Sequence, residues 1–435
     1  MEVKKGYKKT EVGVIPEEWE VKKLGDCFTF SGGYTASRDQ LSNDGYCYLH
    51  YGDIHGANKT FIDVKKEYSK IPKLNVTIRN ISPKSLLNEG DVVFVDASED
   101  DEGASKHIVV FNSEGVPFIS GLHTIVSKSK NDNFDSGYKR YCFQPSFVKS
   151  QFKFYAVGTK VTGISKTNIA KILIPLPTKA EQTAIATALS DADALISSLE
   201  KLIAKKRNIK QGAMQQLLTG KKRLPGFSGK WEVKDNGQLK IKNGKLGDLF
   251  QINQLRKPIG MDEIVTFIGM EDISEDGKII KHNLLSFAEI KKGLTYFQKN
   301  DVLVAKITPC FENGKGACLD NLKTEKGFGS TEFYILRANN NSVSRYIFYH
   351  TQSKIFRRKL EAEMVGSAGQ KRVPSSAIFN YPLSIVHSKA EQIAIAQVLS
   401  DMDAEIEALE MKLEKYKMIK QGLMQNLLTG KIRLI

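Results

Sequence analysis

Residues 179–224 read KAEQTAIATALSDADALISSLEKLIAKKRNIKQGAMQQLLTGKKRL, and residues 389–434 read KAEQIAIAQVLSDMDAEIEALEMKLEKYKMIKQGLMQNLLTGKIRL. The two stretches align without a gap at an offset of 210 residues and are identical at 29 of 46 positions. A copy of this length, present once in each half of the chain, predicts two equivalent structural units on one polypeptide.

Each copy predicts one long amphipathic helix. Thr178-Lys-Ala-Glu181 and Ser388-Lys-Ala-Glu391 match the capping box, in which a hydroxyl accepts from the third amide of the helix and the Glu side chain reaches back. Gly220 and Gly430 suit the left-handed position that follows a helix. Apolar residues recur every three or four positions, which is typical of a heptad seam. The expected spacer and partner-docking residues are Glu181, Gln182, Leu189, Ile196, Leu199, Ile203, Glu391, Gln392, Leu399, Ile406, Leu409 and Leu413.

The length of these helices favours their pairing. A helix of about 38 residues is roughly 57 Å long and is far longer than the usual globular helix. Antiparallel packing of the two would bury both seams, and the segment between them would return as a second globular body. Two independent helices, each covering its own domain, are the alternative. Gly212 and Gly422 inside the helices predict a close backbone approach.

The remaining sequence repeats more weakly. Gly90–Phe94 matches residues 300–304, and Phe118–Val126 lies against Phe328–Leu336 at the same offset of 210. The only two tryptophans, Trp19 and Trp231, both begin Trp-Glu-Val-Lys. These segments predict short β-strands. We therefore expect an α+β protein with an internal pseudo-twofold repeat. It would have two globular mixed α/β domains (residues 1–178 and 223–388) and two long antiparallel helices (179–222 and 389–435) that form a coiled-coil spacer.

A glycine-rich, basic stretch precedes each helix, at residues 158–166 and 366–374. Backbone amides, hydroxyls and cations in one loop suit phosphate contacts, and Gln370 and Arg372 could also read base edges. A surface turn with incidental lysines is the alternative for either loop taken singly. The candidate DNA contacts are Lys160, Thr162, Lys166, Gln370, Lys371 and Arg372.

The composition favours a polyanionic partner. The formal net charge is +15, and Lys and Arg contacts to phosphates release counterions. No apolar run approaches the roughly 20 residues that span a bilayer, and no apolar segment follows the N-terminus as in a secretory signal. We expect a cytoplasmic protein with no membrane partner. The five cysteines are scattered, which argues against a disulfide framework or a zinc ribbon.

Motifs of catalysis are missing from the sequence. Asn313-Gly-Lys-Gly316 lacks the first glycine and the hydroxyl of a P-loop. There is no Asn/Asp-Pro-Pro-Tyr/Phe tetrapeptide of the kind amino-methyltransferases use on a flipped base. The seven histidines show no metal-ligand spacing. We therefore expect a chain that is not an enzyme, has no catalytic residue, and binds no metal or cofactor of its own.

The ordered motifs resemble those of the DNA-specificity subunits of type I restriction–modification enzymes. They are Gly13-Val-Ile-Pro16-x-x-Trp19, Ile174-Pro-Leu-Pro177-x-x-Ala-Glu181-Gln182 and a long helix ending Leu-Leu-Thr-Gly, after which the cycle starts again. The resemblance covers essentially the whole chain. Gly226-Phe-Ser-Gly-Lys-Trp231 lacks Ile-Pro, and Val386-His-Ser388 stands where the first half has Pro-Leu-Pro, so the two halves need not connect identically. In the first half, the residues after the helix lead directly into the next domain, whereas the second repeat stops at the corresponding position, Leu434. Residues 1–12, which precede the first domain, are therefore expected to complete the C-terminal end.

The resemblance implies a function. Two target-recognition domains would each read one half of a split double-stranded DNA sequence, and the helical spacer would dock two modification subunits. Those subunits would carry S-adenosylmethionine-dependent adenine N6-methylation, and two restriction subunits would carry ATP- and Mg-dependent translocation and cleavage. A spacer longer than one turn of B-DNA would leave the intervening bases unread. The alternatives are a basic coiled-coil scaffold without sequence-specific readout and, weakened by the missing motifs, a single-chain restriction–methylation enzyme.

Overall fold

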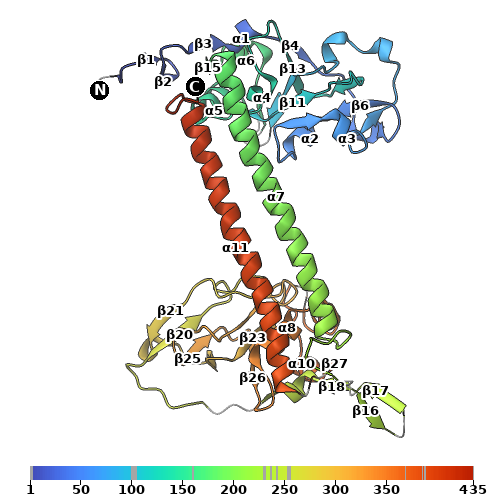
Figure 1. Cartoon of the computed structure of the whole chain (residues 1–435), viewed down its shortest axis with the longest axis vertical. Coiled ribbons are helices and arrows are strands. Elements are labelled where there is room, and N and C mark those ends of the chain that lie inside the picture. Colours follow the sequence, from blue (N-terminus) through green and yellow to red (C-terminus); the bar gives the residue numbers. More distant parts are fainter. Residues whose placement is uncertain are drawn as a thin grey trace. The chain divides into compact units, whose positions relative to one another are not determined.

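The two copied stretches form two long helices, α7 (Lys179–Leu217) and α11 (Lys389–Leu427), of 39 residues each (Figure 1). The amide of Glu181 donates to Thr178 Oγ1 and the amide of Glu391 donates to Ser388 Oγ, both at 3.3 Å. The predicted helix starts are therefore confirmed. The Glu side chains, in contrast, do not close a capping box, because their carboxylates accept hydrogen bonds from other residues.

Glycine ends both helices as expected. Gly220 and Gly430 each have φ of 70°, in the left-handed region that favours glycine. The following turn is closed by a bond from Lys222 N to Gln216 O and, in the second copy, from Ile432 N to Asn426 O, both at 3.2 Å. The interior glycines behave differently. A Cβ placed at Gly212 or Gly422 meets nothing within 4 Å, so the prediction of a close backbone approach is wrong.

The computed structural model describes residues 3–98, 105–158, 161–228, 232–235, 238–241, 243–251, 256–367, 369–384, 386 and 388–434. The chain forms two compact units, one of Met1–Leu199 with Lys412–Ile435 and the other of Glu200–Met411. Each unit thus combines one globular domain with a part of α7 and a part of α11.

The first unit contains a five-stranded sheet of order β4-β13-β9-β11-β7 and a four-stranded sheet of order β12-β6-β8-β5. Its strands are β1 (Tyr7–Thr10), β2 (Gly13–Pro16), β3 (Glu20–Lys23), β4 (Phe28–Gly32), β5 (Leu41–Ser42), β6 (Tyr46–Leu49), β7 (Phe61–Asp63), β8 (Lys73–Leu74), β9 (Val92–Val95), β10 (Ala97–Ser98), β11 (His107–Phe111), β12 (Phe118–Ser120), β13 (Thr124–Ser129), β14 (Thr162–Gly163) and β15 (Leu173–Leu176). Its short helices are α1 (Leu24–Cys27), α2 (Tyr51–His55), α3 (Val64–Glu67), α4 (Ser136–Lys139), α5 (Ser146–Tyr155) and α6 (Lys166–Ile169).

The second unit contains two four-stranded sheets, of order β19-β26-β23-β24 and β21-β20-β25-β22. Its strands are β16 (Glu232–Asp235), β17 (Gln238–Ile241), β18 (Asn243–Lys245), β19 (Phe250–Gln251), β20 (Ile264–Ile268), β21 (Asn283–Ser286), β22 (Thr295–Gln298), β23 (Val302–Ala305), β24 (Gly316–Cys318), β25 (Lys326–Gly329), β26 (Phe333–Ala338) and β27 (Pro382–Ser384). Its short helices are α8 (Ser344–Gln352), α9 (Lys354–Glu361) and α10 (Ser375–Phe379).

The two domains share the arrangement of their central strands. A buried apolar strand, β9 or β23, lies between two antiparallel neighbours, β13 and β11 in the first unit and β26 and β24 in the second. Each domain also has a parallel pair, β6 with β12 and β20 with β25. The predicted α+β repeat is confirmed.

The structure corrects the alignment of one repeated segment. Thr124 pairs with Val95, and Phe333 pairs with Ala305 at the same place in the other domain. Thr124 is therefore equivalent to Phe333, and the offset over Phe118–Val126 is 209 residues rather than 210. Because successive strand residues face opposite sides, a shift of one residue exchanges the two faces. The corrected offset therefore determines which residues of the two domains are equivalent.

Each domain is completed by the long helices. Ile185 and Leu189 from the start of α7 lie in the core of the first unit with Leu427 and Leu428 at the end of α11. In the second unit, the start of α11 and the end of α7 contribute in the same way, with Ile395, Leu399, Met214, Leu217 and Leu218. Burial of apolar side chains at both helix ends holds the helices to the domains.

Candidate DNA interface and helix junctions

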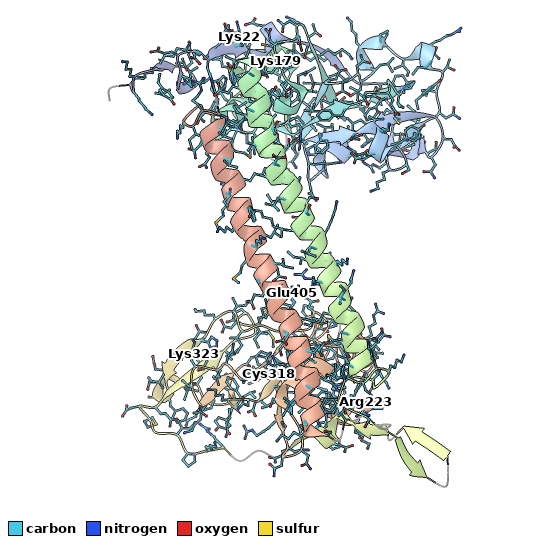
Figure 2. The ribbon with its side chains drawn as sticks, in the orientation of Figure 1. Lys22, Lys179, Arg223, Cys318, Lys323 and Glu405 are labelled. Carbon is cyan, nitrogen blue, oxygen red and sulfur yellow. The ribbon has the colours of Figure 1, made fainter. Side chains whose placement is uncertain are left out.

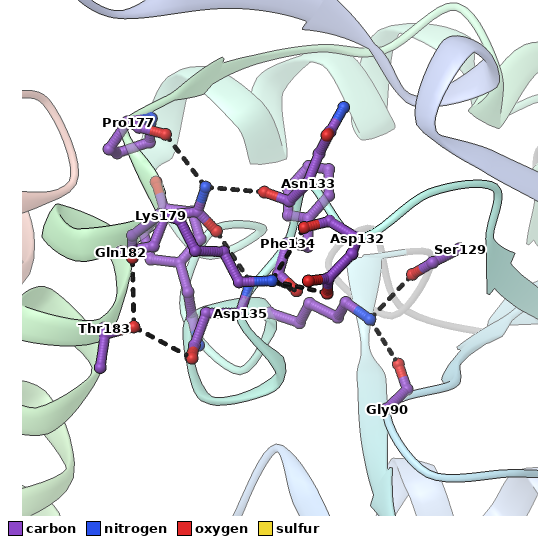
Figure 3. A network of polar contacts seen from close by, with 12 residues as sticks. Gly90, Ser129, Asp132, Asn133, Phe134, Asp135, Pro177, Lys179, Gln182 and Thr183 are labelled. Carbon is purple, nitrogen blue, oxygen red and sulfur yellow. Dashed lines mark hydrogen bonds and ion pairs between the residues drawn. The ribbon is translucent and has the colours of Figure 1, made fainter.

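The start of α7 is fixed to its domain by one buried glutamine. Gln182 Nε2 donates to the carbonyls of Asn133, at 2.9 Å, and Pro177, at 3.0 Å. Gln182 Oε1 accepts from the amide of Asp135 at 2.9 Å. Figure 3 shows this network, in which Lys179 also binds Asp132. All three polar partners of the amide are backbone groups, so the contact does not depend on the side chains of the turn.

Gln392 repeats this arrangement at the start of α11. Its Nε2 donates to the carbonyls of Asn341, at 3.2 Å, and Val386, at 2.7 Å. Its Oε1 accepts from the amide of Val343 at 3.0 Å. Both glutamines are 1% exposed. A buried amide with every partner supplied is strongly oriented, so the same contact sets the direction of each helix on its domain.

A tyrosine and an ion pair hold each helix about three turns further along. In the first unit, Tyr141 donates to Asp193 at 2.7 Å, and Asp193 pairs with Lys420 of α11 at 2.6 Å. In the second unit, Tyr349 donates to Asp403 at 2.8 Å, and Asp403 pairs with Lys210 of α7. Burial raises the pKa of both phenols, so each tyrosine stays a hydrogen-bond donor.

A buried glutamate joins the start of one helix to the residues that follow the other. Arg433 Nε binds Glu181 at 2.5 Å, and Trp19 Nε1 donates to the same carboxylate at 2.7 Å. Arg223, labelled in Figure 2, binds Glu391 through Nε at 2.5 Å and Nη2 at 2.6 Å. The two glutamates are 0% and 1% exposed. Within each unit the two helices are therefore antiparallel, as predicted.

These contacts define two equivalent sets. The first junction is Gln182, Tyr141, Asp193, Lys420, Glu181 and Arg433, and the second junction is Gln392, Tyr349, Asp403, Lys210, Glu391 and Arg223. Tyr7 donates to Gly430 O at 2.9 Å beside the first junction. Tyr7 thus contacts the C-terminal end, as expected for residues 1–12, of which residues 1 and 2 lie outside the described residues.

The expected spacer residues are mostly buried. Glu181, Gln182, Leu189, Leu199, Ile203, Glu391, Gln392, Leu399, Ile406 and Leu413 are buried, and Ile196 and Leu409 are half-buried. The four polar ones belong to the junctions, so any contact with another subunit would come from the exposed flanks of the helices.

The two glycine-rich loops have the same base. In the first unit, the amide of Val157 donates to Gly163 O at 2.8 Å and the reverse bond measures 2.9 Å. In the second unit, Val365 and Arg372 exchange the same two bonds at 3.0 and 2.8 Å. The next residue, Gly158 or Gly366, has φ of 141° or 131°, a conformation that requires glycine. The two loops are therefore anchored to their domains by the same pair of backbone hydrogen bonds, followed by a glycine in the same conformation.

The candidate DNA contacts lie in or next to these loops. Thr162 is in β14, where it pairs with Ser98, and exposed Lys166 begins α6. Gln370 and Lys371 are exposed at the tip and the descending side of the second loop. Lys160 lies outside the described residues. Within each unit the structure therefore brings the described candidates together, and their contact with DNA stays a prediction.

Arg372 is already engaged within the chain. Its Nε lies 3.0 Å from Glu332 Oε2 and its Nη2 lies 2.9 Å from Glu332 Oε1. Glu332 raises the pKa of Arg372, and Arg372 lowers the pKa of Glu332. The guanidinium is thus held in one orientation at the base of the loop.

Sequence reasoning missed the residues that face each loop from the central strand. Asp96 follows β9, and its amide donates to His123 O at 3.1 Å; Lys306 follows β23, and its amide donates to Glu332 O at 2.8 Å. Asp96 and Lys306 are therefore equivalent, as are His123 and Glu332. The offset of 210 already aligns Asp96 with Lys306, but the alignment shifted by one residue in the neighbouring strand hid the second match.

The described residues contain no group of three or more His, Cys, Asp or Glu side chains that could hold a metal ion. Among the same residues, no helix has the length and apolar character needed to cross a bilayer.

Comparisons with known proteins agree on one family. The family described as "Type I restriction modification DNA specificity domain" matches residues 16–211 and 239–416, most of the chain. A putative type I restriction enzyme MjaX specificity subunit from Methanocaldococcus jannaschii is 25% identical over 98% of this chain and 96% of its own length. The type I restriction enzyme EcoAI specificity subunit of Escherichia coli is 38% identical, but the match spans 28% of this chain and 21% of that protein.

A solved structure has the same fold. The crystal structure of a type I restriction–modification system S subunit from M. genitalium superposes with a TM-score of 0.51 at 14% sequence identity, covering 94% of this chain and 96% of the other.

Proposed function

The chain belongs to the type I restriction–modification DNA specificity family, and we propose that it is the subunit that selects a bipartite DNA target for methylation and restriction. The observation that carries the proposal is the contrast between the two junctions and the two loops. The junctions use the same residue types at equivalent positions. The loop bases present different charges on one backbone frame, as two readers of different half-sites require.

Modification subunits are the proposed partners of the helices. Apolar residues remain exposed on α7 and α11 in each unit. In the first unit, Leu195 is 37% exposed and Met418 is 65% exposed. In the second, Leu202 is 37%, Ile209 is 47% and Met411 is 65% exposed. Large exposed apolar side chains on a helix favour a helical partner. Ile209 and Ile419, which is 41% exposed, occupy equivalent positions of the repeat, and the other exposed residues differ between the two helices. One exposed apolar set in each unit favours two modification subunits, with up to two restriction subunits in the complete enzyme.

Catalysis and its cofactors would lie in those partners. We propose that S-adenosylmethionine is bound by the modification subunits, and ATP and Mg by the restriction subunits, where adenine N6-methylation and cleavage take place. This chain would contribute DNA contacts and subunit docking without a catalytic group, and would work in the cytoplasm, where its DNA target is found. Phosphate contacts are proposed for Lys160, Lys166, Lys371 and Arg372, base-edge contacts in addition for Gln370 and Arg372, and a DNA contact of unspecified kind for Thr162.

The test is co-expression with the cognate modification subunit, followed by genome-wide mapping of methylated adenines. We expect one split motif with a fixed unread gap. Replacing residues 14–178 by the corresponding domain of another family member should change one half of the motif and leave the other half and the gap unchanged. Methylation without a motif, or a change in both halves, would contradict the proposal and favour a basic coiled-coil scaffold.

A further inference from the structure

The base of each loop has three equivalent positions on one backbone frame. They are the residue after the central strand, a residue in the turn before β13 or β26, and the residue that closes the loop. The first unit has Asp96, His123 and Gly163 there, and the second has Lys306, Glu332 and Arg372. The equivalence rests on matching backbone bonds. Ile164 N donates to Asp96 O at 2.8 Å, and Val373 N donates to Lys306 O at 3.0 Å.

The side chains at these positions differ in charge and in reach. Asp96 lies 3.4 Å from His123 Nδ1, and Gly163 has no side chain. In the second unit, Glu332 lies under the guanidinium of Arg372, and Lys306 Nζ donates to Thr331 O at 2.7 Å. The side chains of Arg372 and His123 are 45% and 51% exposed. The shared frame therefore presents a long, oriented cation in one domain and an imidazole beside a carboxylate in the other.

Glu332 leaves one edge of Arg372 available. The carboxylate binds the edge formed by Nε and Nη2. Among the described residues, the end of the guanidinium formed by Nη1 and Nη2 has one further contact, at 3.5 Å from Nη1 to the carbonyl of Gln370. Guanine O6 and N7 accept two parallel bonds from one guanidinium in the major groove. An arginine fixed along one edge by a carboxylate is oriented for this contact before DNA arrives, which lowers the entropy lost on binding.

We infer that Arg372, oriented by Glu332, reads a guanine in the half-site of the second domain, and that the first domain reads no guanine from the equivalent position, Gly163. The inference rests on the proposed function and adds the chemistry of one base contact. Lys371, the neighbouring residue of the same loop, has a cation without a planar edge and would bind phosphate instead.

The test uses the complex of this chain with its modification subunit and a library of DNA duplexes randomised in both half-sites. The variants are Arg372→Ala, Arg372→Lys, Glu332→Gln and, as the matched control, Lys371→Ala. Bound duplexes are sequenced, and affinities for the selected sequence are measured at several salt concentrations. The unchanged first half-site reports whether each variant is folded and assembled.

We expect a guanine at one position of the second half-site in the wild type. Arg372→Ala and Arg372→Lys should relax that position alone and weaken binding of the selected sequence by about 5- to 150-fold. Glu332→Gln should weaken the guanine preference partially. Lys371→Ala should keep the motif, weaken all sequences alike and reduce the salt slope by about one.

Two results would overturn the inference. One is an unchanged motif in Arg372→Ala, including a uniform loss like that of Lys371→Ala, because Arg372 would then be a phosphate contact. The other is a second half-site without guanine in the wild type. A wild-type complex that selects no sequence at all would instead contradict the proposed function, so the two failures are distinguishable.

Discussion

At the level of a residue, the side-chain amide of Gln182 fixes the start of α7 to its domain through three hydrogen bonds. Its NH₂ group serves two carbonyls and its oxygen serves one amide, all within the first unit. A carboxylate at this place would turn both donor positions into acceptors facing carbonyl oxygens. Gln392 carries the same set in the second unit. The identity Ala-Glu-Gln in both copies is therefore explained by a contact with the chain's own backbone.

We predict that Gln182→Glu lowers the free energy of unfolding of the first unit by about 2–4 kcal/mol, because it buries a charge opposite two unpaired carbonyls. Gln425→Glu, at an exposed position of α11 in the same unit, is the matched control and should change stability by less than about 0.5 kcal/mol. Urea unfolding monitored by hydrogen exchange measures both. An equal effect of the two substitutions would contradict the role of the network.

Two buried histidines predict how stability depends on pH. Burial lowers the pKa of His107 in the first unit to about 4 and that of His350 in the second unit to about 3, from an ordinary value of 6.5. Below pH 6.5 these two histidines bind protons in the unfolded chain but not in the folded chain, so the free energy of unfolding falls as the pH decreases toward these values.

Each histidine should contribute a slope of up to about 1.4 kcal/mol per pH unit within this window. His350→Phe should flatten the dependence of the second unit while leaving that of the first, and His107→Phe should do the reverse. Hydrogen exchange between pH 7 and pH 5 reports each unit separately. Unaltered slopes in both variants would show that other groups set the acid sensitivity.

At the level of an element, the interior glycines of the long helices contact nothing that requires them. A methyl group at Gly212 or Gly422 would meet open space. Gly212→Ala and Gly422→Ala should each stabilise the isolated chain by about 0.5–1 kcal/mol, because alanine is the better helix former. Thermal unfolding measures this effect. Lower stability would reveal a close contact at these positions, while weaker assembly with the modification subunit would reveal that the partner's backbone approaches there.

The same elements show what the sequence could and could not predict. The helix starts, their length and their antiparallel pairing followed from Thr178, Ser388 and the heptad seam, because capping and periodicity are local signals. The hydrogen-bond partners of the Glu181 carboxylate could not be predicted from the sequence, because Trp19 and Arg433 are distant from it in the chain. The register of Phe118–Val126 was wrong by one residue, since weak similarity in short strands does not distinguish neighbouring offsets.

The candidate loops were located from glycine and lysine content, yet the residues opposite them were not. His123 and Glu332 are equivalent only through bonds to Asp96 and Lys306, and these depend on how separate strands pair. Sequence similarity decreases where two domains read different targets. The positions of most functional interest were therefore the ones that the repeat concealed.

At the level of the whole molecule, each unit contains an arginine that follows the end of one long helix and binds a glutamate at the start of the other long helix. Arg433→Met should lower the free energy of unfolding of the first unit by about 3–5 kcal/mol, because Glu181 would stay buried without its cation. Arg223→Met should do the same to the second unit through Glu391. Unit-resolved hydrogen exchange tests this separation. The double variant Arg433→Met with Glu181→Gln should recover part of the loss, and failure to recover would assign the effect to other contacts.

The equivalence of the first and second junctions also has a consequence for inheritance. Crossing-over within the gene segments that encode the 46-residue repeats would move a whole globular domain from one place to the other, or import one from a related gene. The transplanted domain would meet the same glutamine, the same tyrosine–aspartate pair and the same arginine–glutamate pair that it left. New combinations of half-sites could then arise in a single genetic event, without any compensating substitution at the point of attachment.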